Sequence, residues 1–241
     1  MKVVCIIQAR MGSSRLPGKV MMELGGKPML LNIVDRLSEC KEINEIVVAT
    51  SIFEEDDIIE KLCENNNVNY YRGSLNNVLE RFYNVAKISS ADIIVRITGD
   101  CPLIDSDLVD NVIMKFKSER VDYIAPRSAD GLIRGLDVEV FSFSALEKAY
   151  KEACTDEEKE HVTLYIYRRP DSFKLLNYDF KSRFKSEGIR LCVDEKRDYD
   201  LIKLLYNKFY SEGSLIRVDD VIEYLTKYPE VKKINEDVRQ K

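Results

Sequence analysis

The sequence predicts an α/β fold in which a mostly parallel sheet is flanked by helices, with a β-rich elaboration in the second half. Short β-branched apolar runs alternate with segments of helical periodicity, which is typical of βαβ crossover units. The earliest run, residues 2–8, is almost continuously apolar, as expected for a strand that is buried on both faces. The chain has 241 residues, 45% of them apolar, and is therefore long enough to bury a sizeable core.

The first half of the chain is a series of strand and helix pairs. The predicted strands are residues 2–8, 45–50, 69–72 and 92–97. The first predicted helix begins near Pro28, because proline suits a first helical turn. The other predicted helices are residues 56–65, 78–88 and 105–116. The first helix places an apolar stripe on one face, formed by Met29, Leu30, Ile33, Val34 and Leu37. Parallel strands need crossovers of this length, so the alternation predicts a mostly parallel sheet.

The second half is less regular. Its predicted strands are residues 123–126, 137–142, 173–180 and 189–193, and its predicted helices are 144–153, 157–168, 198–209 and 218–227. The charged segment after Pro229 is expected to be a loose end. We find no internal repeat, linker or break in composition, which favours a single domain over residues 1–241 with a peripheral tail after about residue 228. A division near Ala129 is the alternative.

Composition excludes several classes of protein. Lys and Arg total 37 against 42 for Asp and Glu, so the net charge of −5 argues against a generic nucleic-acid or anionic-membrane binder. Six cysteines without a Cys-x-x-Cys, together with a single histidine, provide no plausible zinc site. The apolar run at the N-terminus stops at Gln8, far short of a signal or spanning segment. We therefore predict a cytoplasmic protein with buried or idle thiols.

A basic loop follows the first predicted strand, at the edge where open α/β sheets bind ligands. No acidic residue precedes Glu23, although the protein as a whole is acidic. Arginine can fork onto phosphate oxygens, lysine supplies a point charge, and Gly and Ser let backbone N–H and hydroxyl groups approach the same anion. The residues suited to this task are Arg10, Gly12, Ser13, Ser14, Arg15 and Lys19. We predict a triphosphate-binding loop; the alternative is a solvated basic surface loop.

Two well-known phosphate motifs are absent from this loop. Five residues separate Gly12 from Gly18, where a P-loop has four, and Val20 follows Lys19 where a metal-binding Ser or Thr is required. No Gly-x-Gly-x-x-Gly follows any predicted strand, because Gly25 and Gly26 stand alone. The sequence therefore gives no support for a Walker-type NTPase or a dinucleotide-binding enzyme.

Two aspartates are predicted at the same edge of the sheet. Asp100 follows the strand 92–97 through a tight turn at Gly99, and Asp194 follows the strand 189–193. Carboxylate oxygens suit Mg²⁺, which bridges phosphate oxygens and keeps several waters. A single loop aspartate is more often a turn former or a helix cap, so each one alone is ambiguous.

Residues 8–19 (QARMGSSRLPGK) resemble the signature loop of the cytidylyltransferases that make CMP-activated sugar acids. The match is closest to the SpsF-type proteins of spore coat polysaccharide biosynthesis, which are related to CMP-Kdo synthetase. Further matches follow in the same order at 72–73, 77–81, 96–104, 134–141, 160–163 and 193–195. The resemblance covers residues 2 to about 205. Asn77 stands where the SpsF-like pattern has aspartate.

The resemblance implies a Rossmann-like fold of the nucleotide-diphospho-sugar transferase type and a Mg²⁺-dependent enzyme. Its reaction would couple CTP to an acidic sugar or phosphorylated small acid and release pyrophosphate, for cell-surface or spore coat polysaccharide. The expected catalytic residues are Arg15, Lys19 and Asp100, and the expected metal ligands are Asp100 and Asp194. The expected nucleotide-binding residues are Ala9, Arg10, Gly12, Ser13, Ser14, Arg15, Lys19, Arg72 and Gly73. The expected acceptor contacts are Thr98, Arg134, Gly135, His161 and Tyr165, the last two on one face of a helix.

Two other functions remain open at this point. A nucleotide-sugar-dependent glycosyltransferase often has an Asp-x-Asp after a strand, whereas here Asp105-x-Asp107 opens a predicted helix and Asp198-x-Asp200 lies in one. A non-catalytic nucleotide-binding module would keep the basic loop without needing both Asp100 and Asp194. The expected partners are CTP and an acidic small molecule, with no nucleic acid or membrane and with a possible homodimer. The sequence does not identify the acceptor.

Overall fold

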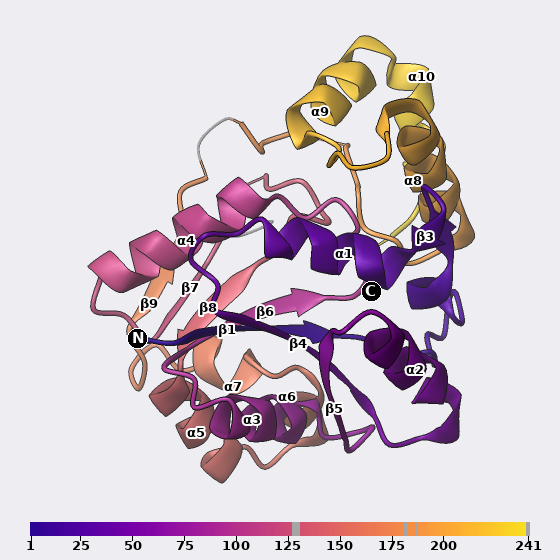
Figure 1. Cartoon of the computed structure of the whole chain (residues 1–241). Coiled ribbons are helices and arrows are strands. Elements are labelled where there is room, and N and C mark those ends of the chain that lie inside the picture. The colour runs from indigo at the N-terminus through magenta and orange to yellow at the C-terminus, as the bar shows by residue number, and fades with distance from the viewer. Residues whose placement is uncertain (127–130, 181–182, 187, 240–241) are drawn as a thin grey trace.

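One seven-stranded sheet forms the centre of the molecule, and helices cover both of its faces (Figure 1). The computed structural model describes residues 1–126, 131–180, 183–186 and 188–239. The strand order is β5-β4-β1-β6-β8-β7-β9. The strands are β1 (Val3–Gln8), β4 (Glu45–Ser51), β5 (Asn69–Gly73), β6 (Ile93–Thr98), β7 (Tyr123–Ala125), β8 (Glu139–Ser142) and β9 (Leu175–Asn177). The predicted fold class is confirmed.

The strands β1, β4, β5 and β6 run parallel, and the second half of the chain adds the antiparallel strand β8. β1 pairs in parallel with β4 and β6, and β4 pairs in parallel with β5. β8 is antiparallel to both β6 and β7, while β7 and β9 are parallel. The carboxyl ends of β1, β4, β5 and β6 therefore lie at the same edge of the sheet, as expected from the strand and helix alternation.

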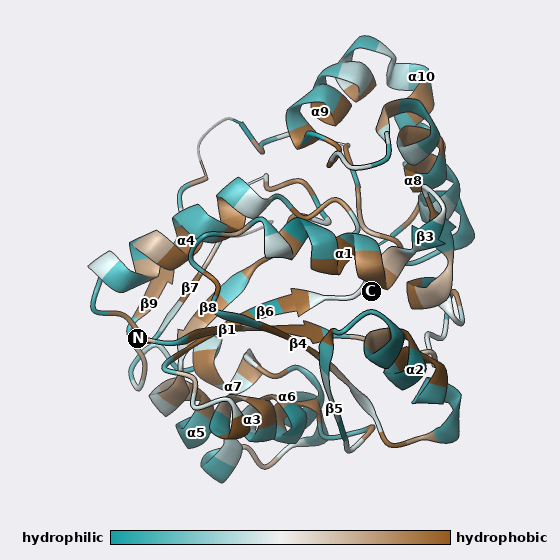
Figure 2. Cartoon of the chain, viewed as in Figure 1, coloured by the Kyte–Doolittle hydropathy of each residue, from teal (hydrophilic) through white to brown (hydrophobic). Residues whose placement is uncertain are grey.

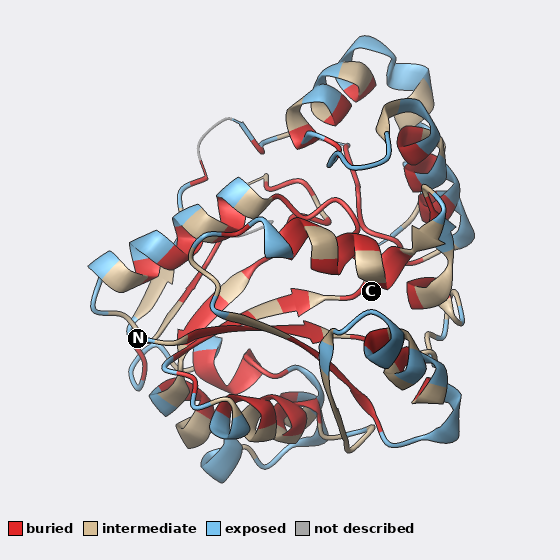
Figure 3. Cartoon of the chain, in the orientation of Figure 1, coloured by how far each residue is buried: buried red, intermediate tan, exposed pale blue. Residues whose placement is uncertain are grey.

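Side chains of β1 alternate between two hydrophobic cores, one on each face of the sheet. Val3, Cys5 and Ile7 pack into the larger core, and Val4 and Ile6 pack into the smaller one. Much of the central sheet is accordingly brown (hydrophobic) in Figure 2 and red (buried) in Figure 3. A strand buried on both faces needs a continuous apolar run, which is the pattern found at residues 2–8.

The helices divide between these two cores. The larger core contains buried residues of α1 (Met29–Ser38), α2 (Asp57–Asn65), α4 (Ser106–Ser118), α8 (Lys196–Phe209) and α9 (Val218–Lys227). The smaller core contains those of α3 (Val78–Ile88), α5 (Phe143–Glu152) and α7 (Leu164–Tyr167). Side-chain caps begin α4 and α3, among others, since Asp105 accepts from Leu108 N at 2.9 Å and Asn77 accepts from Glu80 N at 3.0 Å. The amide oxygen of Asn77 thus caps α3 as a carboxylate would.

Three predictions about local structure are wrong. Residues 157–168 form two short helices, α6 (Asp156–Glu160) and α7, because Thr163 is buried between them and donates to Glu139 Oε1 at 2.7 Å. Residues 189–193 add no strand to the sheet; Arg190 makes an isolated bridge to Arg134, and the segment is apolar because it is buried. The strand predicted at 173–180 is confined to β9.

A short hairpin precedes α1 and was not predicted. β2 (Glu23–Leu24) and β3 (Lys27–Pro28) pair around Gly25 and Gly26, both of which have positive φ. Pro28 belongs to this hairpin and caps α1 with an extended backbone, so the helix begins one residue later than its proline suggests. The glycine pair thus marks a tight turn, for which its conformational freedom is required.

The segment after Pro229 is not a loose end. Residues Pro229–Lys232 form α10, and Asn235 is 1% exposed and hydrogen bonded to the body of the protein. The possible division near Ala129 lies outside the described residues. Within the part of the chain that the structure describes, no helix is long and apolar enough to cross a membrane.

Candidate active site

The basic loop closes on itself at the carboxyl end of β1. The carbonyl of Met11 accepts from Ser13 N at 2.8 Å and from Gly18 N at 2.9 Å, and Gly18 has a φ of 72° that favours glycine. Met11 N donates to Asp56 Oδ1 at 2.7 Å. Asp56 is fully buried after β4 and also accepts from Ser51. Asp56 thus fixes the base of the basic loop. This role was not predicted from the sequence, although Asp56 follows β4, which ends at the same edge of the sheet as β1.

Lys19 lies at the centre of the site. Its Nζ donates to Asp100 Oδ2 at 3.1 Å, to Asp194 Oδ1 at 3.0 Å and to the Val193 carbonyl at 2.6 Å. Burial by itself would lower the pKa of Lys19, but Asp100 and Asp194 raise it above its ordinary value. The structure therefore brings the predicted lysine and both predicted metal ligands together, with the lysine charged.

Both aspartates are held by several partners. Asp194 Oδ1 also contacts Arg15 Nη2 at 3.0 Å, and its Oδ2 accepts from Arg190 Nη2 at 2.6 Å. Burial alone would raise the pKa of Asp194, but Lys19, Arg15 and Arg190 lower it, so the group is ionised. Asp100 Oδ1 accepts from Thr98 Oγ1 at 2.5 Å. Each carboxylate thus has one oxygen toward Lys19 and the other tied to a neighbour.

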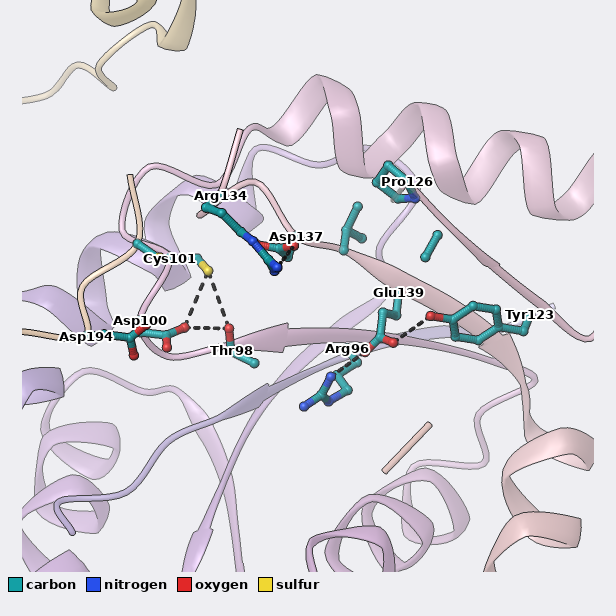
Figure 4. Close-up of a pocket in the computed structure, with 13 residues that line it drawn as sticks. Arg96, Thr98, Asp100, Cys101, Tyr123, Pro126, Arg134, Asp137, Glu139 and Asp194 are labelled. Carbon is teal, nitrogen blue, oxygen red and sulfur yellow. Dashed lines mark hydrogen bonds and ion pairs between the residues drawn. The ribbon is translucent and has the colours of Figure 1, made fainter. Parts of the chain in front are cut away.

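Two cavities meet at these aspartates. We name them the loop cavity, of about 230 Å³, and the strand cavity, of about 320 Å³ (Figure 4 shows the latter). The loop cavity is lined by Gln8, Ala9, Arg10, Ser13, Ser14, Arg15, Lys19, Val20, Thr98, Gly99, Asp100 and Asp194. The strand cavity borders β6 and β8 and shares Thr98, Asp100 and Asp194 with the loop cavity. The loop cavity is therefore rich in cations, and the carboxylates of Asp100 and Asp194 lie between it and the strand cavity.

A half-buried charged pair lines the strand cavity. Arg96 on β6 pairs with Glu139 on β8, and Glu139 Oε1 accepts from Tyr123 Oη at 2.6 Å (Figure 4). Burial by itself would raise the pKa of Glu139, but Arg96 and the hydroxyl donors lower it below its ordinary value. Arg134 lines the same cavity, is 41% exposed, and lies 3.7 Å from Asp137. Arg134 is thus the more accessible of these two arginines.

Gly135 allows the chain beside Arg134 to approach the segment that carries Asp194. It has a φ of +99°, and a Cβ placed on it would lie 2.5 Å from Cys192 N. We expect Gly135→Ala to destabilise the fold by about 3 kcal/mol or more, because backbone strain adds to a clash that no side chain can relieve. Urea unfolding of the variant would measure the loss.

Gly26→Ala is the matched control for this substitution. Gly26 has a φ of +84°, but no atom of the described residues lies within 4 Å of its Cβ position, so only the backbone strain of about 1–2 kcal/mol applies. Equal losses of unfolding free energy in the two variants would contradict the proposed close approach of Gly135.

The other predicted residues lie further from the centre. Arg10 lines the loop cavity and is 4.0 Å from Glu160, whereas Gly12 packs against Glu55. Arg72 pairs with Asp57 and Glu60 and, like Gly73, lines neither cavity.

The structure does not bring His161 and Tyr165 to the aspartates. His161 is exposed at the break between α6 and α7, and the buried Tyr165 donates to Glu152 at 2.5 Å. The two residues do not share the face of one helix, because the helix is interrupted between them. Neither lines the loop cavity or the strand cavity.

The donor set at the centre suits a magnesium ion bound together with phosphate. Oxygens of Asp100 and Asp194 converge on one ammonium group, so a cation is already favoured between them. Among the described residues, no group of three or more His, Cys, Asp or Glu side chains could hold a metal ion. Mg²⁺ is commonly held by one or two carboxylates and completed by water and phosphate oxygens. These residues fit such a site and do not form an all-protein cage.

A profile of the family described as Cytidylyltransferase matches residues 4–221. The chain belongs to this cytidylyltransferase family. It is 44% identical over 243 residues to the uncharacterized protein MJ1063 of Methanocaldococcus jannaschii, covering 100% of this chain and 97% of that protein. It is 35% identical over 238 residues to the spore coat polysaccharide biosynthesis protein SpsF of Bacillus subtilis, covering 95% of each.

Solved structures agree with this assignment. A cytidylyltransferase from Leptospira borgpetersenii superposes with a TM-score of 0.89 at 34% identity, over 100% of this chain and 99% of that one. A CMP-2-keto-3-deoxy-manno-octonic acid synthetase complexed with CTP has a TM-score of 0.65 at 17% identity, over 86% and 99%, which shows the shared fold. This cytidylyltransferase is thus an enzyme, a nucleotidyltransferase that uses CTP, with the predicted Rossmann-like fold.

Proposed function

We propose that the enzyme transfers the cytidylyl group of CTP to an acidic sugar or a phosphorylated small acid and releases pyrophosphate. The observation that supports this proposal most directly is the wall of Thr98, Asp100 and Asp194 shared by the loop cavity and the strand cavity. A nucleotidyl transfer needs the departing pyrophosphate on one side of the α-phosphorus and the acceptor on the other. The names of the relatives, SpsF and a 3-deoxy-manno-octulosonate cytidylyltransferase, favour a sugar acid and a role in polysaccharide biosynthesis.

In this proposal the loop cavity holds the triphosphate. Arg10, Arg15 and Lys19 contact the phosphate oxygens, with N–H and hydroxyl donors from Ser13 and Ser14. Arg15 and Lys19 lie at the end of the loop cavity nearest the aspartates, where they stabilise the departing pyrophosphate. No covalent nucleophile is required, because catalysis rests on positioning and charge.

The strand cavity holds the acceptor, whose oxygen attacks the α-phosphorus from the side opposite the pyrophosphate. Thr98 faces both cavities and Arg134 is accessible to an acidic group on the acceptor. Asp100 and Asp194 would hold Mg²⁺, which neutralises phosphate charge and orients the phosphate oxygens when it is bound. His161, Tyr165, Arg72 and Gly73 take no part in this proposal.

Pyrophosphate release with a panel of acceptors tests the proposed function. The enzyme would be incubated with CTP, Mg²⁺ and individual sugar acids, polyols and phosphorylated acids, and the products weighed by mass spectrometry. We expect acceptor-dependent pyrophosphate and a product heavier by one cytidylyl group, abolished by EDTA and restored by Mg²⁺. Turnover with ATP, GTP or UTP and none with CTP would contradict the proposed transfer of a cytidylyl group. Full activity in EDTA would contradict the proposed requirement for Mg²⁺. Homodimerisation stays a prediction that sedimentation analysis can test.

A further inference from the structure

The two oxygens of Asp194 face different partners. Oδ1 lies 3.0 Å from Lys19 Nζ and 3.0 Å from Arg15 Nη2, both of which line the loop cavity. Oδ2 accepts from Arg190 Nη2 at 2.6 Å. Arg190 is 8% exposed and lines neither the loop cavity nor the strand cavity. The buried arginine therefore contacts the metal-binding carboxylate from behind.

Asp198 holds Arg190 in this position. Arg190 Nε donates to Asp198 Oδ1 at 3.0 Å, and Asp198 is fully buried at the start of α8. The second oxygen of Asp198 accepts from the backbone N–H groups of Asp194 and Glu195 at 2.9 and 3.1 Å. One buried carboxylate thus fixes both the backbone that carries Asp194 and the guanidinium that holds its side chain.

The C-terminal segment completes this arrangement. Asn235 Nδ2 donates to Asp198 Oδ1 at 2.8 Å and to the Arg190 carbonyl at 3.1 Å. A few residues later, the carbonyl of Arg239 accepts from Arg15 Nη1 at 3.4 Å. The sequence predicts a loose end after Pro229. In the structure this segment contacts Arg190 and Asp198, which hold Asp194, and it also contacts Arg15 of the basic loop.

We propose that Arg190 is a positioning residue that fixes Asp194, braced by Asp198 and by Asn235 of the C-terminal segment. The bond to Oδ2 prevents rotation of the carboxylate and leaves Oδ1 directed at Lys19 and Arg15, on the side where Mg²⁺ would bind. Partners behind a metal-binding group generally orient it and tune its affinity. The arginine fork suits this task because it spans two carboxylates, which the single ammonium of lysine cannot do with the same geometry. This inference rests on the metal site of the proposed function.

A purely structural role for the same ion pairs makes a different prediction. Breaking a buried charge pair lowers stability, whether or not the pair supports an active site. Only the positioning role requires the folded variant to bind metal more weakly. Metal affinity measured well below the unfolding temperature therefore separates the two.

The experiment measures Mn²⁺ binding by electron paramagnetic resonance, with and without a non-hydrolysable CTP analogue. We expect Arg190→Lys to weaken Mn²⁺ binding by about 10- to 100-fold. Asn235→Ala removes a brace but keeps the Arg190–Asp194 bond, so we expect a smaller loss, at least about threefold, in the same direction. The thermal midpoint of each variant is recorded alongside, and Asn235→Ala alone decides the test if Arg190→Lys does not fold.

Arg197→Met is the matched control. Arg197 lies near Arg190 in the chain and pairs with Asp237 of the C-terminal segment at 3.4 Å, but its side chain is 62% exposed and does not contact Asp194. We expect wild-type Mn²⁺ affinity in this variant. Wild-type affinity in folded Arg190→Lys, or in Asn235→Ala if that lysine variant does not fold, would overturn the proposal.

The wild-type protein separates this inference from the proposed function. If it binds Mn²⁺ with the CTP analogue but releases no pyrophosphate from CTP with any acceptor, the proposed reaction fails while the variants still test Arg190. If it binds no Mn²⁺ under either condition, the metal site fails and the positioning role is overturned with it.

Discussion

Asp100→Asn is expected to lower kcat for pyrophosphate release by about a thousandfold. Asp100 lies in the wall between the two cavities and directs Oδ2 at Lys19. The amide keeps the shape of the side chain but removes its charge and one acceptor oxygen. A metal contributes several kcal/mol of charge stabilisation, and about 1.4 kcal/mol corresponds to a tenfold change in rate. Steady-state kinetics with saturating CTP and acceptor would measure the loss.

Asp107→Asn provides the control for this substitution. Asp107 belongs to the Asp-x-Asp at the start of α4, and its side chain is 73% exposed and lines neither cavity. We expect unchanged turnover in this variant. Near wild-type kcat in Asp100→Asn would refute the proposed role of Asp100, and an equally large loss in Asp107→Asn would show that the effect is not specific to the aspartate between the two cavities.

Most of the first half of the fold follows from local sequence patterns. The run at residues 2–8 and the one-sided apolar faces of α1 and α4 are each readable within a short window, because burial there repeats with the period of the element. The failures occur where contacts distant in the chain decide the conformation. Thr163 bonds to Glu139 between two helices, and residues 189–193 are apolar because they are buried, although they pair with no strand of the sheet.

The centre of the site could be predicted because parallel strands end at one edge. Lys19 and Asp100 follow β1 and β6, so their meeting follows from strand order. Asp194 was expected there as the end of a sheet strand, but it arrives by another route: Leu191 N donates to the Arg134 carbonyl and Val193 N to the Asp100 carbonyl. Asp194 therefore lies where it was predicted, but loop hydrogen bonds place it there instead of a strand of the sheet.

The supporting residues could not be predicted in the same way. Asp56, Arg190 and Asn235 act through hydrogen bonds of their side chains, and no periodicity in the sequence marks such bonds. Asp198 was predicted to lie in a helix, which is correct but incomplete, since it also binds Arg190. Asn235 lies in a charged segment whose composition is typical of a disordered end, and only the structure shows it to be buried.

Lys19→Met is expected to reduce turnover by about 10²- to 10³-fold without weakening metal binding. The substitution removes the ammonium that contacts Asp100, Asp194 and the Val193 carbonyl. Pyrophosphate then departs without one of its positive partners. The two carboxylates meanwhile lose their shared cation and repel each other, so a divalent ion between them becomes more favourable. Measurement of kcat and of Mn²⁺ affinity in the same preparation tests both statements.

A pH titration cannot replace this substitution. The pKa of Lys19 is raised above its ordinary value, so the ammonium stays charged throughout the range in which the enzyme is assayed. The variant should unfold at a lower temperature than the wild type in EDTA and regain more of its thermal midpoint on addition of Mn²⁺, because the added ion replaces the missing charge. A parallel loss of metal affinity and turnover would instead make Lys19 part of the scaffold that holds the two aspartates, and the leaving group would then depend on Arg15.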